Sequence, residues 1–209
     1  MRNLKSILFI AILAFVAVSC SDDNEPVVLP VEAKTITNLH APQTTDYTVN
    51  PPVTNGEFVK FSFKNGSQVT GDNWDIAFRG TVILVNGGAL IGGLTEEPAR
   101  TGNASLAIVS DVFADVISAP TENQFNQDAV SSYALPHGSG NGWYTYAGPP
   151  THAINPIAGK VFVIKTIEGN YAKMEIKNYY KDGVLGQDTS RYYTFDYVYN
   201  PNVGDKDFQ

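Results

Sequence analysis

The sequence predicts an all-β fold, a single antiparallel β-rich domain with at most one or two short helices. Segments such as Glu57–Phe63 and Asn170–Tyr180 alternate apolar and polar residues with the two-residue period of a half-buried strand. Turn-forming pairs such as Asn65-Gly66 and Glu168-Gly169 separate such segments from their neighbours. No long-period repeat is present, which excludes a propeller or a solenoid.

The N-terminus has the features of a secretory leader. Arg2 and Lys5 precede the apolar run Ile7–Val18, which is too short to span a bilayer as a mature helix. Small residues then lead into Cys20, the only cysteine of the chain, and this arrangement resembles the lipobox of bacterial lipoproteins. We therefore expect residues 1–19 to be a signal peptide and Cys20 to be lipidated; the alternative is an ordinary signal peptide that happens to contain a cysteine.

The residues after the cysteine predict a location. The acidic run Ser21–Glu25 resembles the surface-export signal of Bacteroidetes lipoproteins, which predicts a lipid-anchored protein exposed on the cell surface at the outer membrane. The alternative is a solvated acidic linker on the periplasmic side. Residues 20–34 read as a lipidated flexible tether and residues 35–209 as the domain.

Charge narrows the possible partners. The formal net charge is -7, and loss of two basic residues with the leader lowers it to -9. An acidic protein has no electrostatic attraction for nucleic acid or for an anionic membrane surface. We expect no nucleic-acid partner, and membrane contact through the lipid anchor alone.

The first half of the domain is predicted to contain further strands and one helix candidate. Asn73–Arg79, Thr81–Val85 and Ala89–Ile91 are the strands, and Trp74 falls on the apolar face of the first of them. Over Ser105–Ile117, apolar residues recur at helical spacing, namely Val109, Val112, Phe113 and Val116.

Two interpretations of this helix candidate remain open. Ser110 could cap a short helix that begins at Asp111. A strand over Leu106–Val109 followed by that short helix fits the same residues equally well.

The run Asn141–Thr166 combines aromatic side chains, a Pro/Gly-rich loop that contains His152, and a strand. The strand, Lys160–Thr166, is rich in Val, Ile and Phe and is predicted to pair with Asn170–Tyr180 in a β-hairpin. Arg191–Tyr199, dense in tyrosine, is the final predicted strand. Because loops held on rigid strands often carry binding residues, this run is the predicted site.

Several blocks of the second half carry a family resemblance. The segments GNGWYTY, PIAGKVFVIKT, GNYAKMEIKNYY and RYYTFDYVY, with NWDIAF upstream, resemble the HmuY family of Bacteroidetes haem-binding lipoproteins over residues 58–199. The resemblance implies an all-β, lipid-anchored haemophore on the outer membrane. Such a protein captures haem (protoporphyrin IX iron) for iron acquisition and passes it to a TonB-dependent receptor.

The resemblance also suggests iron ligands. Two histidines of that family coordinate the iron from opposite faces, and one of them follows the tryptophan matched here by Trp143. Ungapped counting puts Gly148 at its position, so His152, four residues further on, is one candidate ligand. His137, in the long excursion over residues 119–140, is the other. Relatives replace one or both histidines, including by methionine.

A porphyrin would also need aromatic walls and anion partners. The aromatic candidates are close to the two histidines in sequence: Trp143, Tyr144, Tyr146, Tyr133 and Phe125. A tyrosine phenolate is a further possible ligand for ferric iron. Arg79 and Arg191 are either ordinary surface charges or partners for the haem propionates. Met174 is expected in the core, and His40 outside the site.

The sequence gives no support for an enzyme. It has no GxSxG elbow, HExxH helix or Walker loop, and no cysteine nucleophile within the domain. We therefore expect no catalytic residues and a function of capture and hand-over. The alternative is a surface lipoprotein of the same fold that binds a glycan or a protein partner and has lost haem ligation.

Overall fold

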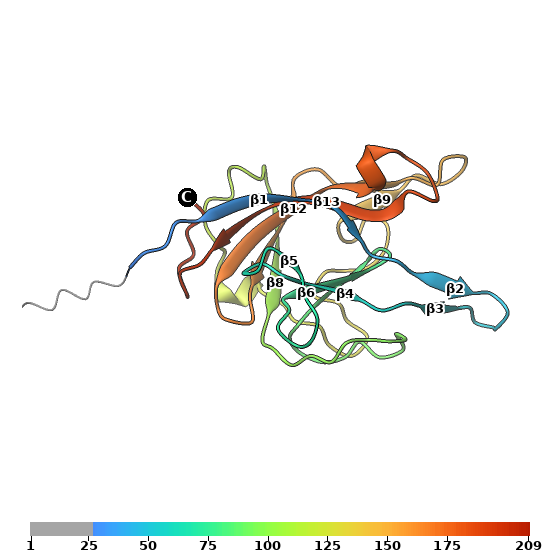
Figure 1. Ribbon diagram of the computed structural model, residues 1–209, viewed down its shortest axis with the longest axis horizontal. Helices are drawn as coiled ribbons and strands as arrows, with labels where there is room; N and C mark the ends of the chain where they lie inside the picture. The colour runs from blue at the N-terminus through green and yellow to red at the C-terminus, as the bar shows by residue number, and fades with distance from the viewer. Residues whose placement is uncertain (1–26) are drawn as a thin grey trace, which may run out of the picture.

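A computed structural model describes residues 27–209, and it confirms the all-β prediction (Figure 1). Antiparallel sheets form the body, and the helices of the described residues are two short 3-10 turns, Glu122–Gln124 (η1) and Lys181–Gly183 (η2). Within residues 27–209, no helix is long and apolar enough to cross a membrane. The predicted signal peptide, Cys20 and the acidic run Ser21–Glu25 lie outside the described residues.

The larger sheet has five strands in the order β1-β13-β12-β11-β8, all antiparallel. Its strands are β1 (Glu32–His40), β13 (Ser190–Asn200), β12 (Tyr171–Tyr180), β11 (Lys160–Lys165) and β8 (Ser105–Ser110). The predicted hairpin between residues 160 and 180 is confirmed, since β11 and β12 pair directly. Strand β1 begins three residues before the predicted start of the domain at residue 35.

The second sheet has the order β5-β4-β6-β7, with strands β5 (Ser67–Gln68), β4 (Val59–Ser62), β6 (Ile76–Arg79) and β7 (Val82–Val85). Two hairpins complete the fold: β2 (Thr44–Asp46) with β3 (Val53–Asn55), and β9 (Tyr144–Tyr146) with β10 (Ile154–Pro156). The β2–β3 hairpin projects away from the body (Figure 1).

Residues 89–91 do not form the predicted strand. Gly88 makes only an isolated bridge to Asp128, and the amide of Ala89 donates to the carbonyl oxygen of Asp128 at 2.8 Å. Residues 88 and 89 therefore lie beside the loop over residues 119–140, and residues 89–91 have no neighbouring strand with which to pair.

The core between the two sheets is unusually aromatic. The ring of Phe61 meets those of Phe63 and Phe195 edge to face, each with centroids 5.4 Å apart. Such pairs contribute about 0.5–1.5 kcal/mol beyond the burial of their area. Met174 is buried in this core as predicted, and Trp74 is buried in a smaller cluster beneath β6 and β7.

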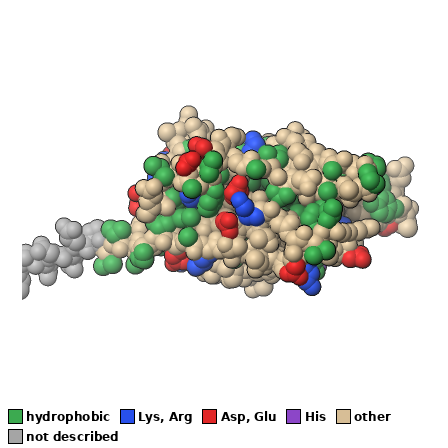
Figure 2. Space-filling view, turned by 90° about the horizontal axis from the view of Figure 1, so that it is seen from above, with side chains coloured by type: hydrophobic (Ala, Val, Ile, Leu, Met, Phe, Trp, Pro, Cys, Tyr) green, Lys and Arg blue, Asp and Glu red, His purple; other side chains and the backbone are tan. Residues whose placement is uncertain are grey.

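Both faces of the five-stranded sheet are covered. The outer face of β12 carries Tyr171 and Lys173 beneath the loop that follows β8. The ammonium group of Lys173 donates to the carbonyl oxygens of Phe113 and Val116, at 2.7 and 2.9 Å, and burial lowers its pKa. On the face of the molecule that Figure 2 shows, hydrophobic side chains form several separate groups, and acidic and basic side chains lie between them.

Of the two interpretations of Ser105–Ile117, the strand over Leu106–Val109 is confirmed, and the short helix from Asp111 that both of them included is wrong. Residues 105–110 form strand β8, which pairs with β11 along its whole length, and residues 111–117 form no helix. Lys173 binds the carbonyl oxygen of Phe113, which a helix would pair with the amide of Ile117, and Val116 packs against the sheet. Tertiary contacts thus override a weak helical pattern.

Asp75, just before β6, joins the two sheets. Its Oδ2 accepts the amide of Phe63 at 2.8 Å, and its Oδ1 accepts the amide of Ile167, in the turn between β11 and β12, at 3.0 Å. The side chain is buried, and desolvation raises the pKa of Asp75 to about 6. One carboxylate therefore satisfies a buried amide next to β4 and a partly buried amide in the turn between β11 and β12.

Replacing this carboxylate should be costly. Asp75→Ala leaves two amides without an acceptor, and we expect the free energy of unfolding to fall by about 2–5 kcal/mol. Urea denaturation measures this, with Asp72→Ala as the control, because the Asp72 side chain is exposed and makes no hydrogen bond in the described structure. A loss below about 1 kcal/mol would show that the junction does not depend on Asp75.

The cost should also depend on pH. The pKa of Asp75 is about 6 in the native protein against an unperturbed 3.8, so the native state binds more protons than the unfolded state between these values. The contribution of Asp75 to stability therefore declines as pH rises through this window. The loss of unfolding free energy in Asp75→Ala should be about 1 kcal/mol larger at about pH 5 than at about pH 7. A loss that is larger at pH 7 would contradict a raised pKa of Asp75.

Candidate functional site

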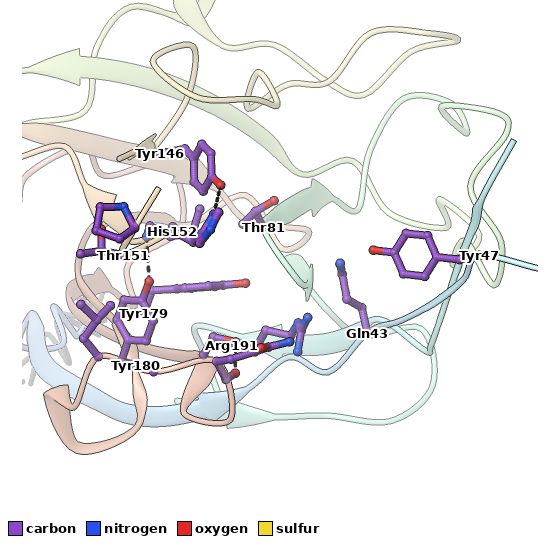
Figure 3. A pocket seen from close by; sticks show the side chains of 15 residues that line it. Gln43, Tyr47, Thr81, Tyr146, Thr151, His152, Tyr179, Tyr180 and Arg191 are labelled. Carbon is purple, nitrogen blue, oxygen red and sulfur yellow. Dashed lines mark hydrogen bonds between the residues drawn. The ribbon is translucent and has the colours of Figure 1, made fainter. Parts of the chain in front are cut away.

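A cleft of about 700 Å³ lies at the end of the sheets where the β9–β10 hairpin, the end of β12 and the start of β13 meet (Figure 3). The β9–β10 hairpin and its loop contribute Tyr146, His152 and Ile154. Strand β12 contributes Tyr179 and Tyr180 at its last two positions. Arg191 enters from β13, and Tyr47 from the tip of the β2–β3 hairpin.

His152 is fixed by its loop and by one neighbour. Its amide donates to the carbonyl oxygen of Gly148 at 2.8 Å, and its φ is 52°, in the left-handed region. The Tyr146 hydroxyl and the Nδ1 of His152 form a short hydrogen bond, and the two side chains point toward one another in Figure 3. When Nδ1 carries the proton and donates it to the phenol oxygen, Nε2 keeps a lone pair for a metal.

Arg191 supplies a positive charge to the cleft. It also adopts a left-handed conformation, with a φ of 70°, while its carbonyl oxygen accepts the amide of Ala41 at 2.8 Å. Among residues 27–209, no carboxylate forms a salt bridge with its guanidinium group. The charge is therefore available to an anionic group of a ligand.

The paired tyrosines at the end of β12 have different roles. The hydroxyl of Tyr180 accepts the amide of Ile154 at 2.7 Å and so holds the β9–β10 hairpin against the sheet. The Tyr179 side chain is only 3% exposed, yet its hydroxyl points into the cleft (Figure 3) and has no hydrogen-bond partner among residues 27–209. Burial raises the pKa of Tyr179, and the nearby charge of Arg191 opposes this.

Comparisons with known proteins identify the family. A family model described as HmuY protein matches residues 55–197, more than half of the chain. This chain belongs to the HmuY family. A comparison with curated proteins found no match.

Several solved structures resemble this HmuY-family chain. The apo HmuY analogue TFO of Tannerella forsythia has 15% identity and a TM-score of 0.46, covering 84% of this chain and 99% of its own. A putative HmuY-like haem-binding protein of Bacteroides vulgatus has 15% identity and a TM-score of 0.39, covering 83% and 93%. Apo PinO of Porphyromonas gingivitis has 16% identity and a TM-score of 0.35, covering 82% and 98%.

Two of the aromatic residues expected at the site lie beneath the cleft. Trp143 is 2% exposed, its indole N–H donates to the carbonyl oxygen of Thr81 at 2.9 Å, and its ring packs 5.3 Å from that of Tyr179. Tyr144 is buried beside Trp143 in the same core. Neither residue lines the cleft; Trp143 packs directly behind Tyr179, and Tyr144 packs on Trp143.

His137 lies near the cleft without lining it. Its Nε2 is 3.4 Å from the Oγ1 of Thr81, a residue that does line the cleft, and its ring is 5.8 Å from that of Tyr133. Partial desolvation of the imidazole lowers the pKa of His137, although much of the residue is exposed. The structure thus brings Tyr146 and His152 into contact. His137 does not reach the cleft itself, and it contacts Thr81, which lines it.

The remaining candidates lie elsewhere. Phe125 packs on Tyr171 at the outer face of the larger sheet. Arg79 is buried, so its interpretation as a surface charge is wrong: its Nη1 donates to the carbonyl oxygens of Gly56 and Thr95, and it lies over the ring of Phe58. It does not line the cleft and so is not placed to meet a propionate there.

Sequence reasoning missed Tyr179 and Tyr180 as cleft residues. The alternating pattern of the strand predicted that its tyrosines pack against neighbouring strands. The signal that could have found these two is their position at the end of β12, next to a polar loop that contains glycine.

The left-handed conformation of Arg191 leads to a paired prediction. Arg191→Gly removes the steric cost of a positive φ and should raise the free energy of unfolding by up to about 1 kcal/mol. Arg191→Ala removes the same guanidinium group but keeps the strain, so it should give no such gain. Thermal or urea unfolding distinguishes the two variants, and equal stability would show that the conformation carries no strain.

Proposed function

We propose that this chain is a haem-binding protein that captures haem in the cleft for iron acquisition and does not catalyse a reaction. The observation that carries the proposal is the pairing of His152 with Tyr146 at the wall of an aromatic cleft that also holds an unpaired guanidinium group. Membership of the HmuY family supports the same conclusion.

The cleft fits a porphyrin in size and lining. Its volume of about 700 Å³ lies within the range of about 300–1,000 Å³ typical of small-molecule sites. Tyr146, which is exposed, offers aromatic surface to the macrocycle, and Ile154 adds apolar surface beside it. Arg191 can bind a propionate carboxylate through two parallel N–H donors.

The donor set also favours haem over a bare metal ion. Among residues 27–209, no group of three or more His, Cys, Asp or Glu side chains could hold a metal ion. A porphyrin brings four nitrogen donors of its own, so one or two protein ligands complete the coordination of its iron. His152 is the first proposed ligand, with Tyr146 orienting its ring, and His137 stays a candidate for the second.

The cellular setting belongs to the same proposal. Lipidation at Cys20 would anchor the chain to the outer membrane, with the residues between Cys20 and strand β1 as the tether and the domain exposed at the cell surface. From there it would hand haem to a TonB-dependent outer-membrane receptor. Trp143 and Tyr144 act as supports of the haem site and not as its walls.

The test is a haemin titration of the protein lacking residues 1–20, which retains every described residue. We expect saturable binding with a Soret band distinct from that of free haemin. His152→Ala should weaken this binding at least about tenfold and shift the Soret band, because the iron loses an imidazole donor. The matched control is His40→Ala, since His40 stacks on Tyr192 at 4.2 Å outside the cleft.

The outcomes separate the parts of the proposal. Binding that is unchanged in His152→Ala would keep haem capture and discard His152 as a ligand. Binding no stronger than that of an unrelated control protein would refute haem capture. The glycan or protein partner would then be the function to test, starting from the exposed rim residue Tyr47, which is 79% exposed.

A further inference from the structure

Four tyrosines pack around the inner wall of the cleft, and three of them use their hydroxyls in hydrogen bonds within the described part of the chain. Tyr146 engages the imidazole of His152, and Tyr180 accepts the amide of Ile154. Tyr193, behind them in the core, donates to the carbonyl oxygen of Gly80 at 2.8 Å. Tyr179 lies among them, and its hydroxyl alone in this group has no partner within the described part of the chain.

The position of this hydroxyl is fixed by its surroundings. The ring of Tyr179 packs 5.3 Å from that of Trp143 and meets the ring of Tyr193 edge to face at 5.2 Å. The side chain is therefore held in one orientation, with only its oxygen directed into the cleft (Figure 3). Because this oxygen faces the cleft and binds no group among residues 27–209, a ligand in the cleft can reach it.

Burial raises the pKa of Tyr179, and the positive charge of Arg191 partly offsets this effect. Arg191 lines the same cleft and is close enough to act electrostatically on Tyr179. Phenolate is a hard, anionic oxygen donor, and it binds ferric iron in haem proteins that use tyrosine as the axial ligand. Ferrous iron carries less charge and gains less from such a donor.

We propose that Tyr179 is an iron ligand of this cleft and makes it selective for ferric haem over ferrous haem. The inference rests on the proposed function, since it concerns the same site. In the binding step the phenol O–H bond breaks, its proton passes to solvent, and the oxygen lone pair forms the bond to Fe³⁺. The iron stays ferric and no electron is transferred.

The experiment compares three ligands: haemin, haem kept ferrous with dithionite under anaerobic conditions, and metal-free protoporphyrin IX. The proteins are the wild type, Tyr179→Phe and, as the matched control, Tyr192→Phe. The variant Tyr179→Phe keeps the ring that packs in the core and removes only the oxygen. Tyr192 stacks on His40 and does not line the cleft.

We expect the wild type to bind haemin at least about tenfold more tightly than ferrous haem, with a tyrosinate signature in the resonance Raman spectrum of the ferric complex. Tyr179→Phe should lose that signature and the ferric preference. Its affinity for protoporphyrin IX should stay within about twofold of wild type, which shows an intact cleft. Tyr192→Phe should behave as the wild type does.

The experiment distinguishes an error in the assignment of Tyr179 as an iron ligand from an error in the proposal that the cleft captures haem. Haemin binding and a tyrosinate signature that persist in Tyr179→Phe would overturn the ligand assignment and leave haem capture standing. No binding of any of the three probes to the wild type would overturn haem capture and the ligand assignment together.

Discussion

The arrangement of the two sheets depends on one buried carboxylate, that of Asp75, which accepts amides from the smaller sheet and from the β11–β12 turn. A charge in this position is unfavourable by itself, and its cost is offset because both amides would otherwise be buried without acceptors. At the opposite end, Tyr193 and Trp143 donate to consecutive carbonyl oxygens, of Gly80 and Thr81, in the turn between β6 and β7. The sheets are thus tied at both ends, and the cleft opens beside the second tie.

This position explains why core and site share residues. Tyr179 packs on Trp143 and Tyr193 on one side and faces the cleft on the other. Arg191 reaches the cleft from the start of β13 because its carbonyl is bound by Ala41, whose own carbonyl accepts the amide of Gly80. Within residues 27–209, six non-glycine residues have a positive φ, and two of them, His152 and Arg191, present their side chains to the cleft.

Much of this could be predicted from the sequence where one face of a strand is apolar. Strand β12 and the core position of Trp74 follow from alternation, and β11 and β13 follow from their content of β-branched and aromatic residues. The helix over residues 105–117 failed because Lys173, distant in sequence, binds the carbonyls of the loop. The burial of Arg79 could not be predicted either, because its partners are backbone carbonyl oxygens, which the pattern of side chains does not reveal. At the cleft, the sequence indicated the loop of His152 but could not tell that Trp143 and Tyr144 would face the core while Tyr179 faced the site.

The β9–β10 hairpin has three residues in each strand and is held to β12 by the hydrogen bond between Ile154 and Tyr180. Two-stranded sheets of this size have little stability of their own. Its inner end is fixed, because Tyr144 of β9 is buried in the core, so local opening is confined to the loop end that carries Tyr146 and His152. Under the proposed function, the rate of haem release would then depend on this loop end and not on the unfolding of the body.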